Sequence, residues 1–198
     1  MGLPVRKTEK HFSYADYKGW PDDERWELIN GVAYCMSPAP TSAHQALAGE
    51  FYWRIAAFLH GKPCRAFIAP FDVRLAEADA KDEQIVNVVQ PDIVVYCDTS
   101  KIDQRGGTAA PEWIIEVLSP STAARDQREK LALYERFGVE EYWLVHPGDR
   151  LLTIYRRGEN GLYGRAQVFD EEATVAAPNF PELSFSLMEI FSVLPETL

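Results

Sequence analysis

Two segments constrain the fold of this chain more than any others: VNVVQPDIVVYC (residues 86–97) and PEWIIEVL (residues 111–118). A strand with one face in water alternates apolar and polar residues, whereas these two segments are apolar almost throughout. They are also bounded by turn-forming residues and are too short for typical helices. We therefore predict two buried strands of a sheet that is covered on both faces.

Two helical patterns flank these strands. The first runs from about Ala43 to Leu59, with apolar residues at helical spacing, Thr41 or Ser42 as its N-cap, and Gly61 after its end. The second runs from about Ala123 to Phe137 and is followed by Gly138. The segments CRAFIAPFDVRL, EEYWLVHP and LLTIYRRG are predicted to be further strands, and a short helix is predicted at the C-terminal end. This order favours one mixed α/β or α+β domain.

The N-terminal region contains a predicted β-hairpin. In RWELINGVAYCM, Asn30-Gly31 lies between two apolar runs, which is the strongest short-range hairpin signal. A short helix is expected between Ser13, as N-cap, and Gly19. Residues 1–12 are polar and are predicted to be mobile, which leaves 13–198 as a single domain.

Composition excludes several classes of protein. The chain has 198 residues, 46% of them hydrophobic, and no run close to eighteen apolar residues, so neither a disordered protein nor a membrane span is expected. The net charge of −10 argues against tight, non-specific binding to DNA. The three cysteines, Cys35, Cys64 and Cys97, form no C-x-x-C pair and are predicted to be reduced thiols of a cytoplasmic protein.

Two carboxylates stand out in the buried segments. Asp92 follows Pro91 at the start of one strand, and Glu116 lies within the other. A buried carboxylate is costly unless a metal, a donor or a cation meets it. Two carboxylates brought together in a cleft suit Mg²⁺, with waters and a substrate phosphate as its other ligands. The alternative from spacing alone is that each one caps a loop or pairs with an arginine.

The helix after Glu116 offers a cation. Asp126, Lys130 and Tyr134 recur at i, i+4 and i+8 and therefore share one face. The helix begins just after the strand that holds Glu116, so Lys130 could reach the cleft. The alternative is an exposed ion pair between Asp126 and Lys130, worth a few tenths of a kcal/mol.

Several motifs occur in the order of a known family: WELINGV, SAHQ, FDVRL, QPDIVVY, EVLSPST, D-x-x-x-K-x-x-x-Y and GVEEYWLV. Over about residues 13–195 the chain resembles the Uma-two family of putative restriction endonucleases, a branch of the PD-(D/E)XK nuclease-like superfamily. The resemblance implies a core of a helix, three strands of a mixed sheet, a second helix and a further strand. Matched to this sequence, these elements are 43–59, 66–75, 88–96, 112–118, 123–137 and 141–146.

The resemblance also implies a site. Asp92, Glu116 and the backbone carbonyl of Val117 would hold Mg²⁺ or Mn²⁺, and the metal would activate a water. The superfamily lysine should stand two residues after the second acid, but this position is Leu118. Lys130 is the candidate to replace it, because some branches carry the lysine on the following helix.

Other residues have weaker assignments. Glu27 matches the family's E-L-I-x-G motif and is either a further metal-facing carboxylate or a hairpin surface residue. His44 is either a proton relay or phosphate contact, or else a capping or core histidine. Gln90 and Asp72 are candidates to line the same cleft, and Tyr134 is expected to pack. Ser119 and Ser121 fit a strand end and an N-cap, and no G-x-S-x-G elbow indicates a serine nucleophile.

The leading prediction is therefore a cytoplasmic, Mg²⁺-dependent endonuclease that hydrolyses phosphodiester bonds in DNA and, by analogy with the superfamily, acts as a homodimer. The first alternative is a nuclease-like fold that binds nucleic acid or a protein without cutting, which Leu118 and the acidic balance favour. The second is a metal-dependent hydrolase of another phosphorylated substrate.

Overall fold

The computed structural model of the chain describes residues 6–7, 10–21, 23–36, 39–120, 122–177 and 179–194. Most of the segment predicted to be mobile, residues 1–12, lies outside this description, as does Ser121. The single-domain assignment of 13–198 stays a prediction.

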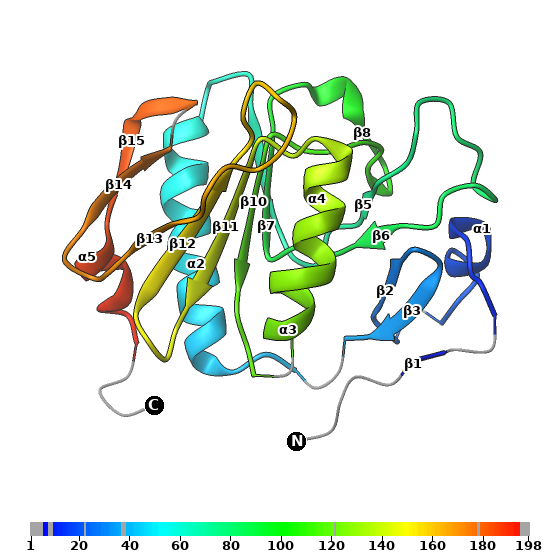
Figure 1. The fold of residues 1–198 in the computed structure, drawn as a ribbon, viewed down its shortest axis with the longest axis horizontal. Coiled ribbons are helices and arrows are strands. Elements are labelled where there is room, and N and C mark those ends of the chain that lie inside the picture. Colours follow the sequence, from blue (N-terminus) through cyan, green and yellow to red (C-terminus); the bar gives the residue numbers. More distant parts are fainter. Residues whose placement is uncertain are drawn as a thin grey trace.

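A mixed six-stranded sheet forms the centre of the fold (Figure 1). Of its strand pairs only β10 and β11 are parallel, so the sheet is mixed as predicted. In spatial order its strands are β13 (Gln167–Phe169), β12 (Leu151–Arg156), β11 (Glu141–His146), β10 (Trp113–Val117), β7 (Ile93–Tyr96) and β4 (Arg65–Ile68).

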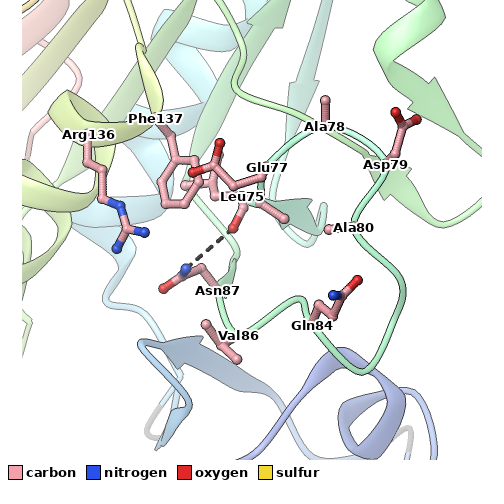
Figure 2. Close-up of a pocket in the computed structure, with 11 residues that line it drawn as sticks. Leu75, Glu77, Ala78, Asp79, Ala80, Gln84, Val86, Asn87, Arg136 and Phe137 are labelled. Carbon is pink, nitrogen blue, oxygen red and sulfur yellow. Dashed lines mark hydrogen bonds between the residues drawn. The ribbon is translucent and has the colours of Figure 1, made fainter.

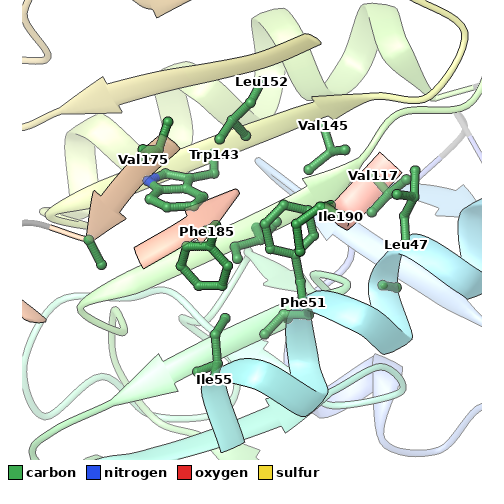
Figure 3. Packing of buried hydrophobic residues seen from close by; sticks show 14 of the residues in the cluster. Leu47, Phe51, Ile55, Val117, Trp143, Val145, Leu152, Val175, Phe185 and Ile190 are labelled. Atoms are coloured by element: carbon green, nitrogen blue, oxygen red, sulfur yellow. The ribbon is translucent and has the colours of Figure 1, made fainter. Parts of the chain in front are cut away.

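Helices cover both faces of this sheet, as the apolar strands predict. On one face α2 (Ser42–Leu59) packs through Leu47, Phe51 and Ile55 against Val117, Trp143 and their neighbours (Figure 3). Residues of β15 (Phe180–Ser186) and α5 (Leu187–Phe191) complete this core. On the opposite face lies the second helix, which carries Leu133 and Tyr134 into a separate core. Along β10, odd-numbered residues therefore face α2, and even-numbered ones face the second helix.

A second sheet of seven short strands adjoins the first, and it contains the predicted hairpin β2–β3. Its order is β1 (Arg6–Lys7), β3 (Val32–Cys35), β2 (Trp26–Ile29), β6 (Val88–Val89), β5 (Val73–Arg74), β9 (Gly106–Gly107) and β8 (Ile102–Asp103). The remaining elements are α1 (Tyr14–Tyr17), the 3₁₀ turn η1 (Thr99–Lys101) and the two-stranded pair β14 (Thr174–Ala177) and β15 (Phe180–Ser186).

Two predicted strands are each divided between the two sheets. The segment 66–75 forms β4 in the central sheet and β5 in the second, and 88–96 forms β6 in the second sheet and β7 in the central one. The prediction of one continuous strand in each place is wrong. Pro70 and Pro91 lie at the breaks, where a residue without an N–H donor cannot continue a hydrogen-bonded ladder.

The second helix is also interrupted. The predicted helix 123–137 consists of α3 (Ala123–Arg125), one turn of π-helix, η2 (Asp126–Lys130), and α4 (Leu131–Phe137), which ends at Gly138 in the left-handed conformation. The prediction of a regular α-helix over this range is therefore wrong at η2. Single π turns within α-helices are frequent at functional sites.

The prediction of three reduced thiols is wrong for Cys64 and Cys97, which form a disulfide. The cause is the register of β4 and β7: Arg65 lies opposite Tyr96, so the next residues outward, Cys64 and Cys97, also lie opposite each other. Cys35, at the end of β3, is free and half-buried.

The N-cap of α2 gives a first prediction. Thr41 Oγ1 accepts a hydrogen bond from the backbone N–H of His44 at 3.2 Å. We expect Thr41→Ala to lower the free energy of unfolding by about 1 kcal/mol, because an orphaned N–H at the helix start loses its acceptor. Urea denaturation checks this, with Thr41→Ser as the control that keeps the hydroxyl. Equal stability of wild type and Thr41→Ala would contradict the cap.

Candidate active site

The candidate site lies where the chain passes between the two sheets. In the antiparallel pairing of β7 and β10, Ile93 is opposite Ile115. One residue further along, Asp92 and Glu116 come side by side, although 23 residues lie between them in sequence. The pairing that the strand order predicted is therefore present in the fold.

Asp92 is held from two directions. Its Oδ2 accepts the backbone N–H of Val117 at 2.7 Å. His44 Nε2, from the first turn of α2, lies 3.0 Å from the same oxygen, and both side chains are largely buried. The structure thus places the His44 side chain against one acid of the predicted pair. A histidine that served only as a cap or as a core residue would not make this contact.

Glu116 faces the second helix, as the alternation along β10 requires. Its Oε1 accepts from Lys130 Nζ at 2.8 Å and from Tyr134 Oη at 3.0 Å. Tyr134 therefore combines the packing expected of it with a hydroxyl contact at the site. Leu118 lies on the same side of β10 as Glu116 and packs in the core of that face, so it occupies the position where the superfamily lysine was expected.

Lys130 joins the two sheets through its ammonium. Besides Glu116, Nζ lies 2.8 Å from Glu27 Oε1 and 3.5 Å from Asp126 Oδ1. The Lys130 side chain is only 2% exposed. The alternative of an exposed Asp126–Lys130 pair is therefore wrong, because the second helix packs this face onto the strand that holds Glu116.

Glu27 lies inside the protein. All four residues of β2 are buried, and the Glu27 side chain is 0% exposed. Its Oε1 also accepts the backbone N–H of Gln90 at 3.0 Å, and Oε2 lies 3.6 Å from Arg125 Nη2. The hairpin-surface alternative is wrong because the second sheet stacks this face of β2 against the second helix.

Burial and neighbouring charges set the protonation of the cluster formed by Glu27, Glu116, Asp126 and Lys130. Burial raises the pKa of Glu116 well above its usual value; the Lys130 ammonium opposes this, and neighbouring carboxylates add to it. Burial likewise disfavours the charged form of Glu27, but the ammonium of Lys130 and the guanidinium of Arg125 hold its pKa below normal. Burial would lower the pKa of Lys130, yet Glu116 and Glu27 outweigh it and raise that pKa well above normal. Lys130 is therefore a permanent cation at neutral pH.

The residues present fit a divalent cation. Counted with Asp92, the cluster has four carboxylates against two fixed cations, Lys130 and Arg125. Within the described part of the chain, no donor bonds Asp92 Oδ1 or Glu116 Oε2, so each acid keeps one oxygen for another partner. No group of three or more His, Cys, Asp or Glu side chains is arranged there to hold a metal. Two carboxylates with water ligands suit Mg²⁺, which rarely has an all-protein cage.

Sequence reasoning missed Arg125, whose buried guanidinium lies beside Glu27 and over the ring of Tyr34 at 5.2 Å. Its place in a charged run gave no signal of burial. Gln90 and Asp72, predicted for the same cleft, lie next to the cluster. The backbone N–H of Gln90 donates to Glu27, and the side-chain amide of Gln90 donates to Asp72.

A hollow of about 340 Å³ lies elsewhere, between the loop after β5 and the end of α4 (Figure 2). Its lining includes Glu77, Asp79 and Arg136, and the Asn87 amide donates to the Leu75 carbonyl there. None of the candidate site residues contributes to this lining.

The Tyr134 hydroxyl gives a second prediction. We expect Tyr134→Phe to lower the free energy of unfolding by about 1.5–3 kcal/mol, because it removes a buried bond to a charged acceptor. Tyr142→Phe is the matched control, since that buried hydroxyl donates at 3.1 Å to the neutral carbonyl of Asp126 and should cost about 0.5–1.5 kcal/mol. Thermal and urea unfolding measure both. A smaller loss in Tyr134→Phe than in Tyr142→Phe would contradict the charged acceptor.

The fold has a mixed sheet covered by helices, with two acids where β7 begins and β10 ends, and it is similar to the fold of a structure described as a putative nuclease. The crystal structure of a putative nuclease belonging to DUF820 from Anabaena variabilis superimposes with a TM-score of 0.74, at 23% identity, over 92% of this chain and 98% of that one. The chain belongs to the Uma-two (Uma2) family, whose model, described as "Putative restriction endonuclease", matches residues 14–188. An uncharacterized protein of Synechocystis sp. is 26% identical over 152 residues, 74% of each chain.

The predicted family and the predicted mixed α+β, nuclease-like fold are thus confirmed. Within the described ranges, no helix has the length and apolar character needed to cross a membrane.

Proposed function

We propose that this protein is a Mg²⁺- or Mn²⁺-dependent endonuclease that hydrolyses phosphodiester bonds in DNA. The observation that carries the proposal is the buried contact of 2.8 Å between Lys130 Nζ and Glu116 Oε1, beside Asp92. This contact supports the hypothesis that Lys130, on the helix that follows, takes the role of the superfamily lysine that Leu118 replaces on the strand.

Asp92, Glu116 and the Val117 carbonyl would hold the metal, which when bound lowers the pKa of a water and stabilises charge on the phosphate. His44 and the Val117 N–H fix one oxygen of Asp92, so the other points to a defined place. Lys130 stays protonated and is fixed by Glu27, so it acts as a cation that orients water or stabilises phosphate charge, and not as a base.

Incubation of supercoiled plasmid and oligonucleotides with Mg²⁺ or Mn²⁺ tests the proposal. Wild type should cut, and EDTA or Asp92→Ala should abolish cutting. Asp170→Ala, at an exposed turn after β13, is the control that should leave cutting unchanged. Cleavage that persists in Asp92→Ala would overturn the proposed site.

A second candidate is a module that binds nucleic acid without cutting. It is favoured by Leu118 and by the pairing of Lys130 with two carboxylates, which occupy the ammonium. Retained oligonucleotide binding with no cleavage in any metal would select this function.

We also propose a homodimer by analogy with the superfamily, which light scattering at several protein concentrations would test.

A further inference from the structure

A hollow of about 530 Å³ opens beside the candidate site, between α1, the segment before β2 and the connection from β6 to β7. This volume falls within the roughly 300–1,000 Å³ typical of small-ligand sites. Its lining includes Tyr17, Trp20, Arg25, Asp72, Gln90 and Arg105. It therefore combines aromatic faces, cations and hydrogen-bonding groups in one concave surface.

The polar side of the hollow is fixed by a hydrogen-bond network centred on Gln90. Arg25 donates to Gln90 Oε1 through Nε at 3.0 Å and Nη2 at 2.8 Å. Gln90 Nε2 in turn lies 2.8 Å from Asp72 Oδ1 and 3.2 Å from Tyr17 Oη. Tyr17 Oη also donates to Asp72 Oδ1 at 3.0 Å. Four side chains from separate parts of the sequence are thus held in fixed orientations.

The aromatic side is equally ordered. The Trp20 ring lies 5.5 Å from the rings of both Tyr17 and Trp26, centroid to centroid. Phe12 packs edge-on against Trp20 at 5.2 Å. Trp20 is only partly buried, so this supported ring borders the hollow.

The network connects the hollow directly to the catalytic candidates. The backbone N–H of Gln90 donates to Glu27 Oε1, the same oxygen that contacts Lys130. Asp92 follows Gln90 by two residues. Gln90 therefore lines the hollow with its side chain and contacts the buried cluster with its backbone.

We propose that this hollow binds one unpaired nucleobase of the strand that is cut at Asp92 and Glu116. The preferred substrate is then DNA with a single-stranded or extruded nucleotide beside the scissile phosphate. The proposal rests on the proposed function for the position of that phosphate. Trp20 and Tyr17 offer the base a stacking surface, and Arg25 and Arg105 favour the attached phosphates. Asp72 bonds Tyr17 and Gln90 through Oδ1 and would meet the hydrogen-bonding edge of the base through Oδ2.

Binding is the readout that tests this site, measured by fluorescence anisotropy in EDTA so that no strand is cut. Wild type should bind a single-stranded oligonucleotide at least about fivefold more tightly than the same strand with abasic positions, since stacking on an aromatic residue contributes about 5- to 150-fold per base. This comparison needs no variant. Trp20→Ala should weaken binding of the intact strand by a similar factor, and Trp20→Phe should restore most of it.

Trp53→Ala is the matched control, because Trp53 is a 63% exposed tryptophan on α2 outside this lining. It should leave binding unchanged. Equal affinity for intact and abasic strands, or for wild type and folded Trp20→Ala, would overturn the proposal, as would a free deoxynucleotide that competes as well as the strand. Base-dependent binding without cleavage in Mg²⁺ would support the base site and overturn the nuclease, whereas base-independent binding with cleavage would do the reverse.

Discussion

Replacing Lys130 with methionine is expected to lower the free energy of unfolding by about 3–5 kcal/mol, because it leaves buried carboxylates without their cation. Glu27 is 0% exposed and Glu116 is 5% exposed, and both lie 2.8 Å from the Lys130 ammonium. Methionine has a similar length and fits an apolar space, so the loss reports the missing charge more than a cavity. Urea denaturation at pH 7 measures it.

Lys101→Met is the control for this variant. Lys101 contacts Glu112 at 3.0 Å, but its side chain is 34% exposed, so the loss there should be about 0–1 kcal/mol. Adding Glu27→Gln to Lys130→Met should recover part of the stability, because one of the uncompensated charges is removed. A loss below about 1 kcal/mol in Lys130→Met would show that the cluster does not depend on this ammonium.

Glu116→Gln is expected to separate activity from stability. Cleavage should fall by more than about 100-fold, since even residues that only orient metal ligands account for about 10- to 100-fold. Stability should stay equal or rise. Burial and the charges of Asp126, Asp92 and Glu27 raise the Glu116 pKa in the folded state. At any pH above the pKa of Glu116 in the unfolded chain, ionisation of this carboxyl therefore destabilises the fold. Glutamine removes this cost because it does not ionise.

Plasmid cleavage and thermal unfolding of the same preparation measure the two effects. Glu112→Gln is the matched control, a partly buried glutamate on the same segment that pairs with Lys101 and lies away from the cluster. It should keep full cleavage. Undiminished cleavage by Glu116→Gln would remove Glu116 from the reaction, and a clear loss of stability would show that its charge supports the fold.

Local patterns were sufficient for the elements that depend on local physics. Asn30-Gly31 forms the hairpin turn, Thr41 caps α2, and the apolar segments become strands covered on both faces. Asp92 and Glu116 were also predictable as neighbours, because two adjacent buried strands each carry one acid. The family resemblance rests on the same short motifs, and the family model matches residues 14–188.

Non-local contacts decided the rest. The division of 66–75 and of 88–96 into two strands each depends on which sheet pairs with each half. The prolines alone do not reveal that pairing. The burial of Glu27 and Arg125 follows from stacking the second sheet on the second helix, and the disulfide from the register of β4 and β7.

The sequence by itself determined the core, the two acids and the absence of a lysine at position 118. Only the tertiary structure decided that Lys130 lies buried between Glu116 and Glu27. A lysine at i+4 from an aspartate is as suited to a solvated surface as to a buried cluster. The outcome depends on what packs against that face of the helix, and here both partners come from distant strands.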